Sequence, residues 1–464
     1  MSGDRSVGIG PQLGELLTRV RARAQDRAER FCWDPHDGAS SPANRGGAKP
    51  AQPLRLLIAD QERTLFRLLD DPRIAVVGPD EGGWENFDVL VIPRADRPGF
   101  ERSAGALPAQ AWARIAAGSA RVVFDASGEG VPHKRWRSAA LHGLLTDMGV
   151  PIGHGAYITQ DRGYGAFYRE HCKAIGLDGR GMQVWVYDQY IQRTFAAYRA
   201  TGEQAFSERL ALYAARPSRR DRRFISLNNT VRPIKALFLL RVLEEGLWER
   251  GFISLGNVGE LNGGRVLDSD AFRRELAELP GFADVLPRWT ERLDELAALG
   301  PIRLGEAGSA GTDKAFRRAL LDPSALAEYG ESWFTVVTES HATDRLHRIT
   351  EKPFKPLLNF HPMIVLGGVG ALRLIRSYGF ETFPGLFDES YDEATNVRQR
   401  FDRVFAQVAR LCRAGEEDLA SWAEAGAETL LFNAWWGLVE LPRLFASRID
   451  ASLIDRLEGF VLED

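Results

Sequence analysis

The chain has 464 residues, a length that suits two or three domains better than a single ordinary core. Hydrophobic residues make up 44% and charged residues 26%, a balance typical of globular proteins that excludes a wholly disordered chain. The formal net charge of −4 excludes a general attraction to nucleic acid or anionic lipid, so any anion site must be local.

The first 50 residues begin with a helical pattern and end as a loop. Leu13, Leu17 and Val20 have the spacing of one helix face. The stretch GASSPANRGG at 38–47 is made of residues typical of loops. We therefore expect residues 1–50 to be a helix and a flexible segment before the first domain.

Residues 51–215 predict a first α/β domain. Short β-rich runs alternate with helical stretches, which is typical of a parallel sheet with helices on both faces. Ligands bind at the carboxyl ends of the strands in such sheets, and several runs end at or near a polar residue. The runs are 54–59, 74–77, 89–92, 121–124, 156–159 and 183–186, and the polar residues are Asp60, Asp125, Gln160 and Asp188.

A basic stretch, ARPSRRDRR at 215–223, separates this half from the next. We interpret it as an interdomain linker whose arginines either lie in a solvated loop or contact phosphate. A second Rossmann-like domain is expected over 216–410, and a helical tail over 411–464 packs back through its aromatic run at 432–436. The expected strands are 224–227, 252–255, 334–338 and 363–366, and the expected helices are 234–249, 271–299 and two from about 351 and 371.

Three cysteines, Cys32, Cys172 and Cys412, lack the spacing of zinc or redox motifs and are interpreted as thiols in a reducing compartment. No apolar run reaches the roughly 18 residues that a membrane helix needs, and the N-terminus lacks the apolar stretch of a signal peptide. We expect a cytoplasmic protein without a transmembrane segment. Association with a membrane surface through a partner or an acceptor lipid stays open.

The most informative segment is TEKPFKP at 350–356, which lies between two predicted strands. Thr350 is placed to cap a helix, and such a helix start would offer free N–H groups to a diphosphate. Lys352 and Lys355 would add positive charge, and Glu351 would accept hydrogen bonds from sugar hydroxyls. The competing interpretation is a plain cap and a surface ion pair between Glu351 and Lys355.

This segment resembles the donor-site motif of fucosyltransferase-type enzymes of the GT-B class, which have two Rossmann domains. A wider set of motifs is similar to a bacterial and phage glycosyltransferase family, and the similarity covers roughly residues 220–410. The resemblance implies an α/β, GT-B-like fold with two domains facing a cleft, and a nucleotide-sugar donor as substrate. The motifs are 224–229 (FISLNN) with Arg232, 337–339 (VTE), 350–356 (TEKPFKP), 379–383 (GFETF) and 388–392 (DESYD).

Four further residues are candidates for donor binding. Arg232 follows the first strand of the second domain, where an arginine can clamp phosphate oxygens, and Asn228 is either a ligand or a turn residue. Glu339 and His341 lie just past a strand end, with an ion pair to Arg345 or Arg348 as the alternative.

Transfer by inversion needs a base near the acceptor hydroxyl. The segment VVFDASGEGVPH at 122–133 offers Asp125 or Glu129, with His133 as a third candidate, and a turn capped by Asp125 is the alternative. Asp268-Ser269-Asp270 matches a metal-binding D-x-D pattern, but it stands directly before a helix, so capping explains it better and no metal is expected.

The sequence thus favours a metal-independent glycosyltransferase without a cofactor. Its donor would be a nucleotide-sugar, and its acceptor a glycan, a lipid-linked glycan, a protein or modified DNA. Two alternatives remain: a non-catalytic module that binds glycans or nucleotides, and an enzyme such as an epimerase that needs no external acceptor. General nucleic-acid binding is not expected.

Overall fold

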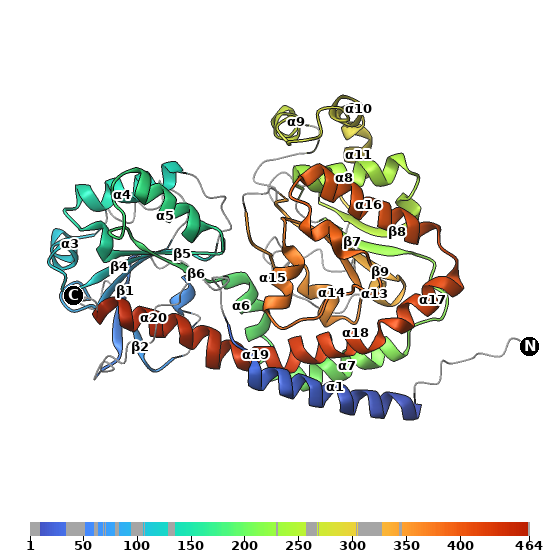
Figure 1. Ribbon diagram of the computed structural model, residues 1–464, viewed down its shortest axis with the longest axis horizontal. Helices are drawn as coiled ribbons and strands as arrows, with labels where there is room; N and C mark the ends of the chain where they lie inside the picture. The colour runs from blue at the N-terminus through green and yellow to red at the C-terminus, as the bar shows by residue number, and fades with distance from the viewer. Residues whose placement is uncertain are drawn as a thin grey trace, which may run out of the picture. The chain divides into compact units, whose positions relative to one another are not determined.

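The computed structural model describes residues 10–33, 52–59, 64–67, 69, 71–78, 83–93, 105, 107–128, 135–228, 231–256, 267, 269–302, 304, 327–342 and 346–462. The chain is α/β, with two separate parallel sheets and a helical C-terminal region (Figure 1). It divides into two compact units. Unit 1 comprises Met1–Phe31, Thr194–Asp344 and Ile349–Pro442, and unit 2 comprises Cys32–Arg193, Arg345–Arg348 and Arg443–Asp464.

Unit 2 contains a six-stranded parallel sheet in the order β2-β1-β3-β4-β5-β6. Its central strands β3 and β4 are buried at every position, as expected of a parallel sheet covered on both faces. The strands are β1 (Leu54–Ile58), β2 (Ile74–Val77), β3 (Val89–Pro93), β4 (Arg121–Ala126), β5 (Gly155–Thr159) and β6 (Gln183–Val186).

The helices of unit 2 come from residues 65–193 and from the C-terminal end of the chain. α20 (Ala451–Leu462) packs here through Phe460, whose ring lies 5.4 Å from that of Trp185 and whose carbonyl accepts a 3.2 Å hydrogen bond from Arg121. The others are η1 (Leu65–Arg67), α3 (Ala109–Ala116), α4 (Arg135–Asp147), η3 (Ile152–His154), α5 (Tyr164–Ala174) and the first part of α6 (Gln189–Ala196).

Unit 1 contains a four-stranded parallel sheet in the order β10-β9-β7-β8. The strands are β7 (Phe224–Asn228), β8 (Gly251–Leu255), β9 (Phe334–Thr338) and β10 (Met363–Leu366). The chain moves from β7 to β8 on one side and then returns to place β9 on the other side of β7. The carboxyl ends of β7 and β9 therefore form a topological switch point, the place where open α/β sheets bind their ligands.

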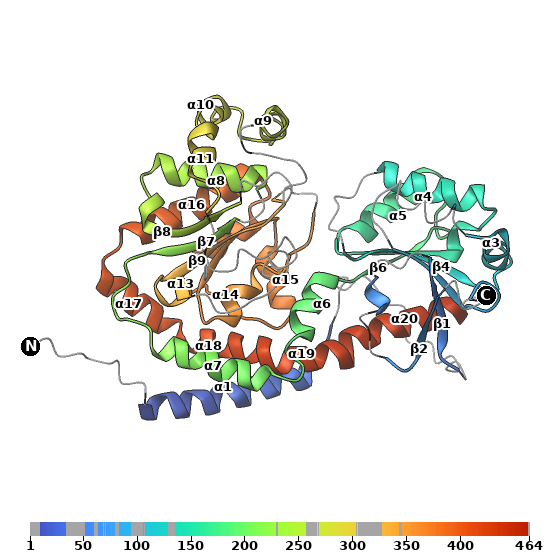
Figure 2. The same ribbon diagram turned by 180° about the vertical axis from the view of Figure 1, so that it is seen from behind.

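Helices cover both faces of this sheet. α8 (Pro233–Glu244) and α16 (Val397–Arg413) lie on one side, and α7 (Gly202–Ala214), α18 (Ala427–Trp435) and α1 (Gly10–Arg30) lie on the other (Figure 2). The remaining helices of this unit are η4 (Trp248–Arg250), α13 (Ala327–Gly330), α14 (Phe354–Leu358), α15 (Ala371–Ser377), η5 (Glu389–Glu393) and α17 (Glu416–Ala425). Beyond α18 the helical path continues as η6 (Trp436–Glu440), α19 (Leu441–Leu444) and η7 (Phe445–Asp450).

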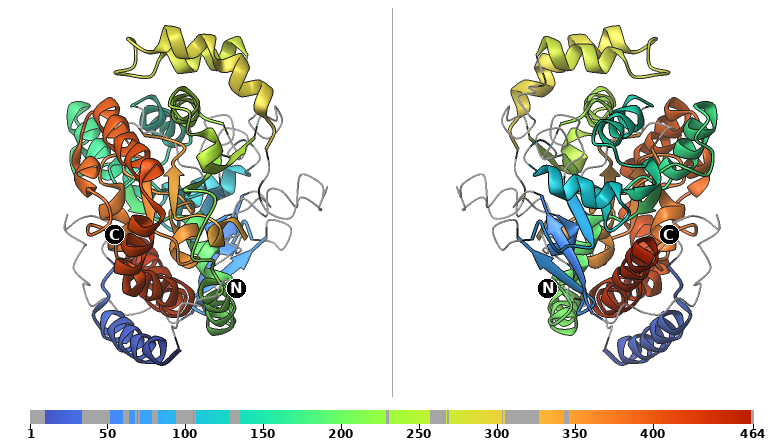
Figure 3. Two further views of the ribbon diagram at one scale, coloured as in Figure 1. Left: turned by 90° about the vertical axis from the view of Figure 1, so that its right-hand side faces the viewer. Right: turned by 90° about the vertical axis from the view of Figure 1, so that its left-hand side faces the viewer.

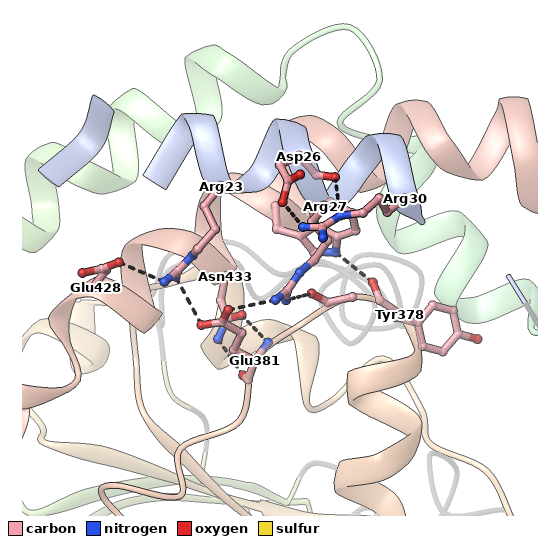
Figure 4. A network of polar contacts seen from close by, with 10 residues as sticks. Arg23, Asp26, Arg27, Arg30, Tyr378, Glu381, Glu428 and Asn433 are labelled. Atoms are coloured by element: carbon pink, nitrogen blue, oxygen red, sulfur yellow. Dashed lines mark hydrogen bonds and ion pairs between the residues drawn. The ribbon is translucent and has the colours of Figure 1, made fainter. Parts of the chain in front are cut away.

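The N-terminal helix α1 is held on α18 by arginine side chains (Figure 4). Arg23 pairs with Glu381 and Glu428 at 3.2 and 2.9 Å, and Arg27 donates to the Gly379 carbonyl at 2.7 Å. Both guanidinium groups also lie over the ring of Phe432, at 4.5 and 4.6 Å from its centroid. These contacts explain why α1 belongs to unit 1, although residues 32–193 separate it from the rest of that unit in sequence.

The units differ from the domain boundaries expected from sequence. The boundary expected at 215/216 lies at 193/194, because α7 packs within unit 1: an added Cβ at Gly202 would lie 1.9 Å from the Leu438 carbonyl oxygen. The expected tail is also divided, because α17 and α18 pack in unit 1 whereas η7 and α20 belong to unit 2. Both differences arise from tertiary contacts, which cannot be recognised from the local composition of the sequence.

The single helix expected over 271–299 is three helices. They are α9 (Asp270–Ala277), α10 (Leu286–Glu291) and α11 (Leu293–Leu299), which lie against α8 (Figure 3). Pro280 and Gly281, the latter with a φ of 81°, end the first helix. Among the described residues, no helix is long and apolar enough to cross a membrane.

Candidate anion site at the switch point of the four-stranded sheet

Asn228 ends β7 and joins it to β9. Its side-chain oxygen accepts a 2.6 Å hydrogen bond from the Thr338 hydroxyl, and its side-chain nitrogen donates to the Ser226 hydroxyl at 3.0 Å. Its backbone N–H donates to the Ser254 hydroxyl of β8 at 2.8 Å. Asn228 is fully buried. These bonds occupy the amide in fixing the carboxyl ends of three strands, so Asn228 positions the site.

Glu339 directly follows β9 and is buried. Its carboxylate accepts hydrogen bonds from the Thr350 backbone N–H at 3.1 Å and from the Thr350 hydroxyl at 2.7 Å. An added Cβ at Gly367, just past β10, would lie 3.2 Å from the Glu339 side chain, so glycine allows this close approach. Glu339 therefore anchors the start of the TEKPFKP segment to the strand end.

The expectation that Thr350 caps a helix is wrong. Residues 351–353 form a turn, and α14 begins only at Phe354, with Pro353 at the N-cap position. The Thr350 hydroxyl is instead bonded to Glu339. A helix of five residues has little dipole, so any positive potential here comes from charged side chains.

Glu351 and Lys352 extend from this turn and interact with each other. The Lys352 ammonium lies 3.3 Å from the Glu351 carboxylate and donates to the Thr350 hydroxyl at 3.1 Å. Burial raises the pKa of Glu351, but Lys352 and Lys355 outweigh it and the net pKa lies below its ordinary value. Glu351 is therefore ionised, and in place of the expected surface ion pair with Lys355 it makes a partly buried pair with its neighbour Lys352.

Lys235 belongs to the same cluster and was not identified from the sequence. It is the third residue of α8, after Arg232 at the N-cap and Pro233 at the first helical position. Its side chain is 1% exposed, and its ammonium nitrogen makes no hydrogen bond to any described residue. A buried charged group is expected to be paired, so a lysine without an acceptor indicates a place for a ligand.

The pKa of Lys235 is lowered to about 7, and burial is the largest cause. Lys352 and Arg232 contribute to the lowering, whereas Glu339 and Glu351 oppose it. These influences show that four charged groups from the α8 start, the β9 end and the turn before α14 surround the amine. A titratable group whose pKa is perturbed by burial and by specific charged neighbours is a candidate for a functional site.

The other donor-site candidates lie around this cluster. Arg232 is half-buried at the start of α8, and Lys355 is buried in α14, where its charge acts on Glu351. His341 is half-buried two residues beyond Glu339. The structure thus brings Asn228, Arg232, Glu339, Thr350, Glu351 and Lys352 together at the switch point, hereafter the switch-point site, and adds Lys235.

Arg219 of the 215–223 stretch is exposed, and three other arginines of the stretch make packing contacts. Arg216 donates to the carbonyls of Asn359 and Phe360, both at 2.7 Å, directly after α14. Arg220 donates to the Ser332 carbonyl at 2.7 Å. Arg223 pairs with Glu416. Neither alternative considered from sequence, a solvated loop or phosphate contact, describes these three arginines.

Asp125 lies in unit 2 and its carboxylate is fully bonded. One oxygen accepts from the Thr64 hydroxyl at 2.7 Å and the Leu65 N–H at 2.9 Å. The other accepts from the hydroxyl and the N–H of Ser127, at 2.6 and 3.0 Å. The Asp125 carboxylate therefore holds the loop at Thr64 and the turn at Ser127 in place. Glu129 and His133, the other candidate bases, lie outside the described residues.

The two acidic patterns have structural partners. Ser269 caps α9 by accepting from the Phe272 N–H at 3.2 Å, as expected, and Asp268 lies outside the described residues. Asp392 accepts from the Leu372 N–H at the start of α15 at 3.0 Å, and Glu389 accepts from the Phe383 N–H at 2.7 Å. Within the part of the chain that the structure describes, no three His, Cys, Asp or Glu residues are grouped as metal ligands.

Comparison with family models, with curated proteins and with solved structures finds no match to this chain. The assignment of a function therefore depends on the geometry of the switch-point site and on the motifs in the sequence.

Proposed function

We propose that this chain is a glycosyltransferase that binds a nucleotide-sugar donor at the switch-point site. The observation that carries the proposal is Lys235, a fully buried amine without a hydrogen-bond acceptor among the described residues, at the switch point beside Arg232 and Lys352. A diphosphate would supply the acceptor and the negative charge that the Lys235 amine lacks among the described residues.

The proposed chemistry is electrostatic. The bond between the sugar C1 and the phosphate oxygen breaks, and a bond from C1 to the acceptor oxygen forms. The acceptor hydroxyl gives its proton to a base, and a nucleoside diphosphate leaves. Arg232, Lys235 and Lys352 would neutralise the charge that develops on the leaving diphosphate. Glu351 is ionised and buried beside these cations, so it would accept hydrogen bonds from ribose or sugar hydroxyls.

The resemblance of the TEKPFKP segment to the donor-site motif of GT-B enzymes supports a sugar nucleotide over other anions. The proposal assigns donor binding to unit 1 and acceptor binding to unit 2, each with its own parallel sheet. It leaves Glu129 and His133 as candidates for the base, since the Asp125 carboxylate already accepts four hydrogen bonds. The acceptor would be a glycan, a lipid-linked glycan, a protein or modified DNA.

A thermal-shift screen against UDP-, GDP-, CMP- and dTDP-sugars tests donor binding. At a ligand concentration of about 100 times Kd, one nucleotide-sugar class should raise the melting temperature by at least roughly 2 °C. Lys352→Ala should abolish that shift, whereas Lys173→Ala, at an exposed lysine of α5, should keep it. A wild-type protein that responds to no nucleotide-sugar would contradict the proposal.

The same donor then tests catalysis. We expect release of free nucleoside diphosphate that increases when candidate acceptors are added. Binding without any release, with or without acceptors, would instead indicate a non-catalytic binding module. Conversion of the sugar while it stays attached to the nucleotide would indicate an epimerase.

A further inference from the structure

Lys235 occupies a site in which a positive charge has no compensation. The described charged groups that act on its amine are Lys352, Glu339, Glu351 and Arg232. Two are cations and two are carboxylates, so the surroundings of the amine are balanced before Lys235 is counted. A proton on Lys235 would therefore be an excess charge.

The two carboxylates that face Lys235 already have partners. Glu339 accepts both the N–H and the hydroxyl of Thr350, and Glu351 is 3.3 Å from the Lys352 ammonium. Neither forms a hydrogen bond to Lys235. A buried ammonium without an acceptor costs several kcal/mol, and an amine escapes that cost by releasing its proton.

A diphosphate would reverse this balance. It brings two negative charges and several acceptor oxygens into reach of the amine, and an opposite charge close to an amine favours its protonated form. The surroundings of Lys235 would then change from balanced to anionic.

We propose that binding of an anionic donor at the switch-point site is coupled to protonation of Lys235, whose amine is neutral above neutral pH in the ligand-free protein and there takes up to one proton from solvent as the diphosphate enters. No covalent bond forms or breaks in this step. The inference rests on the proposed function, because it requires the donor to bind at this site.

The pKa of about 7 that burial imposes on Lys235 supports the proposal, because such an amine is largely neutral at about pH 8. The proposed coupling predicts how Kd for the donor changes with pH. Above the pKa of the free protein, donor binding must take up a proton, so Kd should rise by up to roughly tenfold per pH unit. Well below that pKa the amine already carries its proton, so Kd should no longer depend on it.

Isothermal titration calorimetry measures this proton directly. The probe is UDP-glucose or GDP-mannose, whichever binds, because the diphosphate of a nucleotide-sugar does not titrate near neutral pH. Titrations at about pH 8 in PIPES, HEPES and Tris, which differ in ionisation enthalpy, give the number of protons taken up from the slope of heat against that enthalpy. We expect close to one proton at about pH 8 and close to none at about pH 5.5.

Two substitutions assign the proton to Lys235. Lys235→Arg keeps a permanent charge and should bind with no proton uptake, because guanidinium does not release its proton in this range. Lys235→Met keeps the length without the charge and should bind at least roughly tenfold more weakly, also without proton uptake. Lys173→Met, on the surface of unit 2, should behave as wild type. Thermal unfolding of each variant confirms that it is folded.

The outcomes separate the two proposals. Donor binding with the same heat in all buffers, or undiminished proton uptake in Lys235→Arg, would overturn the coupling and leave the proposed function standing. Failure of wild type to bind either nucleotide-sugar or the other classes in the screen would overturn both.

Discussion

Buried polar side chains at the carboxyl ends of β7 and β9 are of two kinds. Asn228, Glu339 and Thr350 have their hydrogen-bonding atoms occupied by the protein, so their role is to hold strand ends and the TEKPFKP segment in place. Lys235 is buried without such a bond to the described residues. This difference separates residues that position the site from a cation that a ligand would complete.

Glu339→Gln tests the positioning role. The amide keeps one acceptor for Thr350 but removes a carboxylate, so we expect nucleotide-sugar affinity to fall by roughly tenfold and stability to fall by about 1–2 kcal/mol. Because Glu339 raises the pKa of Lys235, its loss should also move the pH midpoint of proton uptake to lower pH. Calorimetry over a pH series measures both.

Glu417→Gln, at an exposed glutamate of α17, is the matched control and should change neither quantity. A Glu339→Gln protein with reduced stability but unchanged affinity and midpoint would mean that Glu339 serves only the fold.

At the residue scale, most residues of the switch-point site could be predicted, because they lie in the sequence motifs that resemble a donor site. Lys235 was overlooked because it lies in an apolar helix, PIKALFLL, where the surrounding residues dominate the pattern. One signal was present: a single lysine in a helix buried on nearly all sides, directly after a strand and its turn. The Glu339 partner Thr350 and the Asp125 partners Thr64 and Leu65 could not be predicted, because they lie 11 to 61 positions away in sequence.

At the scale of elements, α14 differs most from its expectation. Its five residues are followed by Phe360, a non-glycine residue with a φ of 52°, which is an unfavourable conformation. Arg216 stabilises this turn by donating to the carbonyls of Asn359 and Phe360, and the Tyr213 ring stacks on Phe360 at 5.1 Å. Distant residues thus determine where α14 ends.

Arg216→Met tests this support. The substitution removes two buried hydrogen bonds from a charged donor, so we expect the free energy of unfolding to fall by about 2–3 kcal/mol in urea denaturation. Arg219→Met, three residues along at an exposed position, should change it by less than about 0.5 kcal/mol. Equal stability of the two variants would show that Arg216 does not hold the turn.

The strands were predicted far better than the helices. β2, β6, β9 and β10 have the expected bounds, because short apolar runs between turns specify buried parallel strands. Helix bounds were predicted less well where proline and glycine interrupt a long helical pattern, as in 271–299. They were also predicted less well where the expected capping residue bonds to another partner, as Thr350 does to Glu339. A local sequence pattern shows the periodicity of apolar residues, but it does not show which distant groups compete for a side chain's hydrogen bonds.

At the scale of the molecule, neither unit is continuous in sequence. Unit 1 gathers α1 from the N-terminus, and unit 2 receives α20 from the C-terminus. Composition and linker signals divide a sequence only into contiguous segments, so they could not predict that each unit contains a helix from a distant part of the chain. The class, α/β with two parallel sheets, could be predicted because the alternation of strands and helices runs through both halves.

The most direct test of the central claim is a crystal structure of the protein with the nucleotide-sugar that raises its melting temperature most. We predict that the diphosphate lies at the carboxyl ends of β7 and β9, contacts Arg232, Lys235 and Lys352, and has Glu351 within hydrogen-bonding reach of a hydroxyl group. A nucleotide-sugar bound at the six-stranded sheet of unit 2, with Lys235 still buried and without a ligand, would contradict the account.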